Sequence, residues 1–169
     1  MAAPKAPNIQ NITVFSDASY CPDTHAAGGA YWARSDTHRA QGAFSLEGVT
    51  ASHEAEVMAA CNGVLQLAQE PSFRAELEQG RTTRLVLVVD CLAIKQALEG
   101  SPVPLSVTGR KAVTDVLALR KRLGFFLKVN HVKAHTGGKQ PRQWVNRWCD
   151  TAAREKMMEG RQAHSAPLA

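Results

Sequence analysis

The chain has 169 residues, of which 44% are hydrophobic, and it carries a formal net charge of +5 at pH 7. This length suits one domain that buries its own core, and no apolar run approaches the roughly 20 residues that span a bilayer. The start of the chain lacks the apolar core of a secretory signal, and the four cysteines lie far apart. We therefore expect a cytoplasmic protein, taken as a monomer, with reduced thiols and no zinc ribbon. The positive charge favours a polyanionic partner.

Three strands are predicted near the N-terminus, after a loose tail over residues 1–10 that is rich in alanine and proline. Residues 11–19 and 28–35 place apolar side chains before turn-rich segments, and residues 40–48 repeat this pattern after a turn. Strands at such close spacing favour an antiparallel meander.

The period of the apolar residues then changes. From residue 52 to residue 70 they recur at helical spacing, with Ser52 as the candidate N-cap. Residues 74–80 allow a helical turn in the connection that follows. The run 85–89, which leads directly into Asp90, is apolar on both faces, as in a central strand covered on both sides. Residues 125–134 alternate as a fifth strand does.

Three more helices are predicted, and a glycine marks the end of each. They cover residues 91–99, 113–123 and 141–160, and their glycines are Gly100, Gly124 and Gly160. A meander followed by strand–helix units implies an α/β fold, in which a five-stranded mixed sheet, three antiparallel strands then parallel strands, is flanked by helices. We place the domain at residues 11–160 and a second loose tail at 161–169.

Acidic residues fall where these elements begin or end. Asp17 ends the first strand, and Asp90 ends the fourth. Glu56 lies in the first turns of the long helix, and Asp150 lies one turn after Asn146 in the last helix. In mixed sheets, chemistry gathers where strands end and helices begin. If the first and fourth strands are neighbours, the four carboxylates can meet at one sheet edge.

Each acid also has an ordinary structural explanation. Asp17 and Asp150 can be solvated surface residues, Glu56 can complement the helix dipole, and Asp90 can cap the following helix. Four converging carboxylates would instead repel one another and hold protons unless cations neutralise them. Mg²⁺ prefers such oxygen ligands. Two such ions, roughly 3.5–4 Å apart, can activate a water and stabilise the leaving oxygen in phosphodiester hydrolysis.

Five segments stand in the order and spacing of the motifs of type 1 ribonuclease H: VFSDAS, EAEVMAA, LVVDCLAIKQAL, VKAHTGG and NRWCDTAAR. The sequence resembles this family from Asn11 to Lys156. The resemblance implies the ribonuclease H fold and Mg²⁺-dependent cleavage of the RNA strand of RNA–DNA hybrids, leaving 5′-phosphate and 3′-hydroxyl ends. It also implies two Mg²⁺ ions during catalysis, with Mn²⁺ as a substitute ion.

The resemblance assigns metal binding and catalysis to four acids: Asp17, Glu56, Asp90 and Asp150. His135 matches a loop histidine that assists proton transfer or product release, and Asn146 matches a position close to the substrate and metals. Ser52 and His53 stand where the family usually has two asparagines that contact the hybrid across the minor groove. Both can still hydrogen-bond a 2′-hydroxyl or a base edge.

The chain departs from the family in other substrate contacts. Leu92 stands where a polar residue is usual, and the basic handle that many bacterial members carry before the fifth strand is missing. We infer that other cations supply part of the grip on phosphates, so that binding is strongly salt-sensitive. The candidates are Lys139, Arg142, Arg110, Lys111 and the cluster 120–122.

Two alternatives are set against an active ribonuclease H. The fold also serves junction resolvases and exonucleases, although Ala18 and Ser19 after Asp17 do not match the Asp-x-Glu of proofreading exonucleases. A catalytically silent hybrid-binding module generally lacks one or more acids, whereas this chain retains all four. The active enzyme is the preferred interpretation.

Overall fold

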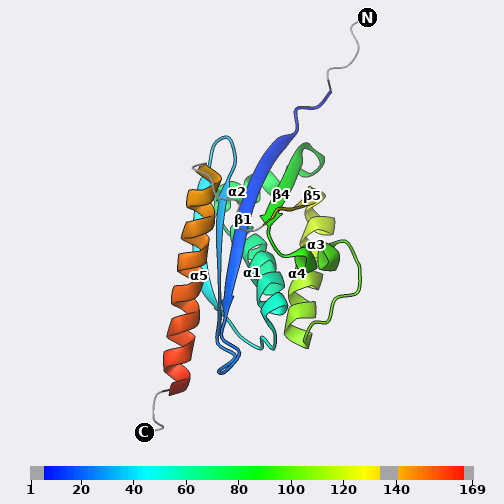
Figure 1. The fold of residues 1–169 in the computed structure, drawn as a ribbon. Helices are drawn as coiled ribbons and strands as arrows, with labels where there is room; N and C mark the ends of the chain where they lie inside the picture. Colours follow the sequence, from blue (N-terminus) through cyan, green and yellow to red (C-terminus); the bar gives the residue numbers. More distant parts are fainter. Residues whose placement is uncertain (1–5, 134–140, 166–169) are drawn as a thin grey trace, which may run out of the picture.

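The computed structural model describes residues 6–133 and 141–165, and its centre is one five-stranded sheet in the order β3-β2-β1-β4-β5 (Figure 1). The strands are β1 (Gln10–Tyr20), β2 (Ala27–Arg34), β3 (Arg39–Leu46), β4 (Thr83–Val89) and β5 (Phe126–His131). The first three form the predicted antiparallel meander, and β4 pairs parallel with both β1 and β5. The predicted mixed α/β sheet is thus confirmed.

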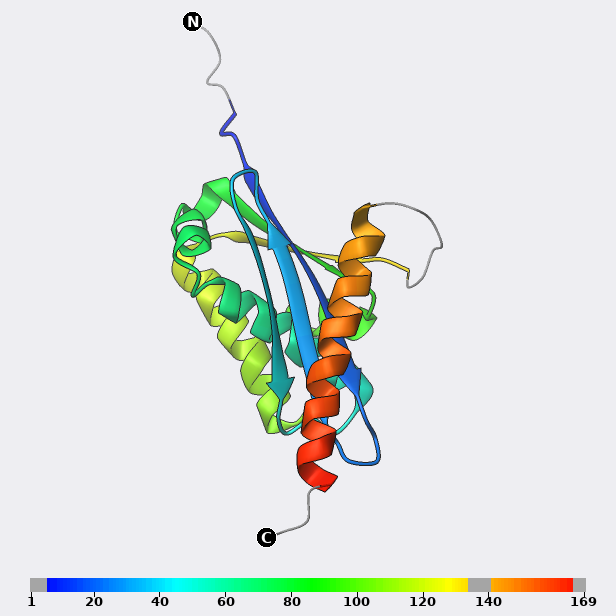
Figure 2. The same cartoon turned by 90° about the vertical axis from the view of Figure 1, so that its left-hand side faces the viewer.

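Helices cover both faces of this sheet. They are α1 (Ser52–Leu67), α2 (Pro71–Leu77), α3 (Leu92–Leu98), α4 (Val107–Leu123) and α5 (Pro141–Ser165), with a short 3₁₀ turn, η1 (Gly80–Thr82), before β4. Helices α1, α3 and α4 lie on one face, and α5 lies on the other, where Figure 2 shows it in front of the sheet. Strand side chains alternate between the faces. Ile12 and Val14 therefore enter the larger core with α1, while Phe15 packs on the α5 side.

The ends of the helices follow backbone geometry more closely than composition. Gly100 and Gly124 have positive φ values of 85° and 78°, and both follow the ends of their helices, as predicted. Gly160 does not have a positive φ, so it leaves the helix uninterrupted, and α5 continues to Ser165. The predicted end at Gly160 is therefore wrong. The predicted N-cap is wrong as well, because Ala51 occupies that position and Ser52 is the first helical residue.

Two expectations drawn from composition concern the thiols and the membrane. The four cysteines are free, as predicted. Burial raises the pKa of Cys61 and of Cys149 to about 12, so both are thiols at neutral pH. Within residues 6–133 and 141–165, no helix combines the length and the apolar character needed to cross a membrane.

Candidate metal centre

The parallel register of β1 and β4 brings Asp17 and Asp90 together. Phe15 is paired with Val88, and β4 ends at Val89 while β1 continues. Counting on from this pair, Asp17 is level with Asp90, at the point where β4 stops and its partner runs on. The backbone of Asp90 is also held by β5, because the His131 Nε2–H donates to the Asp90 carbonyl oxygen at 3.1 Å.

Glu56 reaches the same point from α1, and a glycine on β2 makes this approach possible. Gly29 pairs with Ala18, the residue after Asp17. A Cβ at Gly29 would lie 2.9 Å from the Cβ of Ala59, one turn after Glu56 on α1. Real Cβ atoms do not come this close, so any side chain at Gly29 would push α1, and with it Glu56, away from β1.

The neighbouring glycine performs the same function for α5 on the opposite face. A Cβ at Gly28 would lie only 2.2 Å from the carbonyl oxygen of Ala153, which is one turn after Asp150. Successive residues of a strand face opposite sides. Gly28 and Gly29 therefore let two helices approach the same part of the sheet, and each of these helices carries an acid one turn before its contact.

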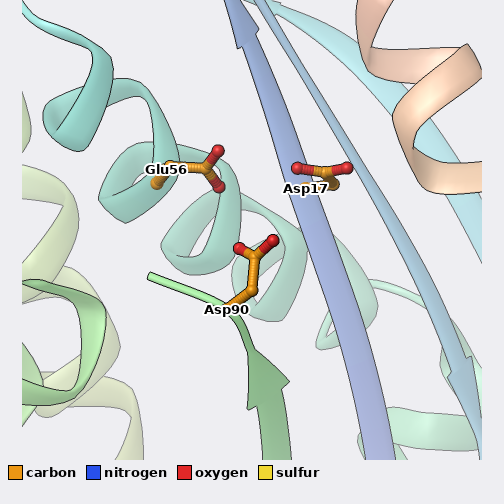
Figure 3. A group of neighbouring side chains, drawn as sticks. All are labelled: Asp17, Glu56 and Asp90. Carbon is orange, nitrogen blue, oxygen red and sulfur yellow. The ribbon is translucent and has the colours of Figure 1, made fainter. Parts of the chain in front are cut away.

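Three of the four predicted acids converge. Asp17, Glu56 and Asp90 each offer a carboxylate oxygen, and these atoms lie within 4.8 Å of one another (Figure 3). Asp17 and Glu56 are half-buried, whereas Asp90 is exposed. In the part of the chain that the structure describes, no other group of three or more Asp, Glu, His or Cys side chains lies close enough together to hold a metal ion. We call these three residues the acid cluster.

Asp150 lies beside the acid cluster but is not part of it. Its side chain is 50% exposed, and its Oδ2 forms an ion pair with Arg154, one turn further along α5, at 3.6 Å. The negative charge of Asp150 nevertheless contributes to raising the pKa of Glu56. The structure thus groups three of the four carboxylates, and the fourth lies outside this group with a cationic partner on its own helix.

Glu56 is the residue most affected by this environment. Its burial raises its pKa from 4.5 to about 9, and the charges of Asp17 and Asp90 act in the same direction. The backbone N–H of Ala18 opposes the shift but is outweighed. A lone carboxyl in this position would hold a proton at neutral pH.

The chemistry of the acid cluster fits a hard divalent cation. Glu56 Oε2 is buried and has no hydrogen-bond partner among the described residues. The donor set consists of carboxylate oxygens, which Mg²⁺ and similar ions prefer. The competing explanation for Asp90 is also excluded, because Cys91 occupies the N-cap of α3 and no side chain caps that helix. The carboxylate of Asp90 is therefore not used as a helix cap.

The predicted substrate contacts lie around the acid cluster. Ser52 and His53 open α1. Ser52 is exposed, and His53 is half-buried, with its Nε2–H donating to the Pro104 carbonyl at 2.6 Å. Asn146 is exposed on α5, one turn before Asp150. His135 lies outside the described residues. Contact of these residues with a substrate stays a prediction.

Two buried acids that the sequence did not single out have structural roles. Glu54 is 1% exposed and accepts hydrogen bonds from the backbone N–H and the hydroxyl of Ser106, the N-cap of α4. Glu76 accepts hydrogen bonds from Ser35, Thr37 and His38, at 2.8, 3.1 and 2.6 Å. The partners of each acid lie some 40 to 50 positions away along the chain. A local sequence pattern therefore cannot predict these contacts.

Comparison with known proteins identifies the fold. No family model and no curated protein matches the sequence. Among solved structures, one similar protein is LC11-RNase H1, which was isolated from compost. Its structure in complex with an RNA/DNA hybrid superposes with a TM-score of 0.64 at 13% identity, over 88% of this chain and 97% of that one. RNase H1 of Halobacterium salinarum gives 0.62 at 16% identity, over 88% and 98%. The N-terminal RNase H domain of a Mycobacterium tuberculosis protein gives 0.61 at 15% identity, over 91% and 98%.

These structures agree with the family that the sequence motifs indicated. Because the sequence identities are low, the superpositions establish the fold and nothing finer. The acid cluster is observed in the structure of this chain. The chain has the ribonuclease H fold, and the structures that it resembles are those of type 1 ribonucleases H.

Proposed function

We propose that this protein is an endonuclease that hydrolyses the RNA strand of RNA–DNA hybrids and leaves 5′-phosphate and 3′-hydroxyl ends. The observation that carries the proposal is the convergence of Asp17, Glu56 and Asp90 within 4.8 Å at the end of β4. The ribonuclease H fold, together with the hybrid bound to LC11-RNase H1, supports this choice among nucleases. The proposal includes a monomeric enzyme in the cytoplasm, and size-exclusion chromatography checks the monomer.

The acid cluster would hold Mg²⁺, with Mn²⁺ as a substitute ion, and Asp150, whose charge already acts on Glu56, would contribute a further carboxylate. When bound, two such ions supply activation of the attacking water and stabilisation of the leaving oxygen. The three carboxylates contribute the negative charge and the fixed position, because each is held by a different element of the fold: β1, α1 and the end of β4.

The remaining residues of the proposed site bind and orient the hybrid. His53 donates through Nε2 to Pro104, so in the neutral ring Nδ1 is an acceptor that can take a hydrogen bond from a 2′-hydroxyl. Ser52 offers a hydroxyl beside it, and Asn146 offers an amide on the α5 side. His135 would assist proton transfer or product release. Recognition of 2′-hydroxyls is what would restrict cleavage to the RNA strand.

A labelled-strand cleavage assay tests the proposal. RNA–DNA hybrid, duplex RNA, duplex DNA, four-way DNA junctions and single strands are each incubated with and without Mg²⁺. We expect cleavage of the hybrid's RNA strand alone, dependent on Mg²⁺ and absent from an Asp90→Asn variant. Preferential cutting of junctions would instead identify a resolvase, and hybrid binding without any cleavage would identify a silent binding module.

A further inference from the structure

A cleft of about 430 Å³ lies beside β5, bordered by helices α3 and α4. Among the residues that the structure describes, β5 is the last strand of the sheet and pairs only with β4. The polar lining comes from three elements: Lys95 and Glu99 of α3, Arg120 of α4, and Lys128 and Asn130 of β5. We call this space the β5 cleft.

The β5 cleft has an excess of positive charge. Lys95 and Glu99 form an exposed ion pair at 3.4 Å and offset each other. Arg120 and Lys128 are also exposed, and neither has an ion-pair partner among the described residues. Two unpaired cations on different elements, with the side-chain amide of Asn130 in the same lining, suit an anion that enters from solvent.

Other cations of α4 are used differently. Arg110 donates to the carbonyl oxygen of Leu105 at 2.9 Å, and Lys111 pairs with Asp115 at 2.5 Å. Successive helix residues are about 100° apart, so the basic residues of α4 do not share one face. Of the cations on α4 that the sequence suggested for gripping phosphates, Arg120 is the one that lines the β5 cleft.

The position of the β5 cleft connects it to the acid cluster. Asn130 lines the cleft, and the next residue, His131, donates to the carbonyl oxygen of Asp90. The cleft therefore begins beside the acid cluster and extends along β5, away from Asp90. One residue along β5 therefore separates the lining of the cleft from a contact with the backbone of Asp90.

We propose that the β5 cleft is a second phosphate-binding site, which holds a backbone phosphate of the nucleic acid a short distance from the bond that is cut. The inference rests on the proposed function and deepens it. The carboxylates of the acid cluster repel phosphates, so a separate cationic contact is needed to keep the polyanion in place. An acidic peptide could meet the same cations, but continuity with the acid cluster favours nucleic acid.

Binding measurements with matched variants test this proposal. Arg120→Gln, Lys128→Gln and the double variant are made in the full-length Asp90→Asn background, so that the hybrid stays intact in Mg²⁺. The control is Arg74→Gln with Lys156→Gln, which removes the same charge from two cations outside the β5 cleft, each in a local ion pair. Fluorescence anisotropy of a labelled RNA–DNA hybrid is recorded at several salt concentrations, and circular dichroism checks the fold.

We expect each single change to lower the slope of log K against log salt by about 1, and the double variant to bind roughly 3- to 10-fold more weakly than the control at about 0.1 M salt. Equal affinities and slopes for the double variant and the control would overturn the proposal. The remaining explanation for Lys128 would then be that its charge keeps the exposed edge of β5 from pairing with another chain. A polyglutamate peptide that binds through Arg120 and Lys128, with hybrid binding unchanged, would overturn it too. Because the assay measures binding, its result is separate from whether the parent chain cleaves hybrids.

Discussion

Replacement of Glu56 by glutamine should stabilise the metal-free protein at neutral pH. The pKa of Glu56 is about 9 in the folded chain, against an ordinary value of 4.5. Because the folded-state value is the higher one, the contribution of this group to the free energy of unfolding is complete below about pH 4.5. It is lost progressively as the pH rises towards 9.

The size of the effect follows from the proton that the folded chain retains. pH 7 lies about 2.5 units above the ordinary pKa of the carboxyl, so keeping it protonated in the folded chain lowers the free energy of unfolding by about 3 kcal/mol. At pH 5 the same loss is below about 1 kcal/mol. Glutamine carries no charge at either pH. We therefore expect Glu56→Gln to raise the free energy of unfolding by about 1–3 kcal/mol at pH 7, after allowance for a buried amide that lacks a full set of partners, and by little at pH 5.

Urea unfolding followed by circular dichroism in EDTA, at pH 5, 7 and 8, measures this difference. Glu99→Gln is the matched control, because its side chain is 53% exposed and its loss should give a small effect at each pH. A stability gain for Glu56→Gln that did not grow between pH 5 and pH 7 would refute the electrostatic account of the acid cluster.

Four further substitutions test the acid cluster, the packing of α5 and the proposed role of His135. Asp90→Asn should abolish hybrid cleavage while leaving the melting temperature equal or higher, since it removes one of the charges that repel each other; near-normal turnover would defeat the assignment. Gly28→Ala should destabilise the fold by about 1–3 kcal/mol, because the new Cβ meets the backbone of α5. In Gly160→Ala the new Cβ would make an ordinary van der Waals contact with Ala26, so this change should stabilise the fold by up to about 1 kcal/mol. Thermal unfolding compares the two glycine variants. His135→Ala should slow turnover in a steady-state assay without abolishing it, and an unchanged rate would remove this residue from the proposed mechanism.

The sequence was most informative where local pattern and long-range pairing agree. The apolar run before Asp90 predicted a central strand, and this strand is β4. The order of strands and helices then predicted the mixed sheet. Asp17 and Asp90 could be placed at one edge because parallel neighbours end on the same side, and the register confirms this.

What the sequence could not show depends on contacts between distant segments. Gly28 and Gly29 read only as part of a strand, yet they set how closely α5 and α1 approach it. Asp150 and Arg154 stand four residues apart in the sequence, but only the structure shows that they form an ion pair and that Asp150 lies outside the acid cluster. Gly160 has the composition of a helix end, and only its φ shows that the helix continues.

The most direct test of the central claim is isothermal titration calorimetry of Mg²⁺ binding at pH 7, in two buffers that differ in ionisation enthalpy. If Asp17, Glu56 and Asp90 form one cation site, binding should displace the proton held by Glu56, so that close to one proton is released per binding event. Both the binding heat and the proton release should be lost in Asp90→Asn. Binding without proton release, or binding that Asp90→Asn leaves intact, would contradict the account.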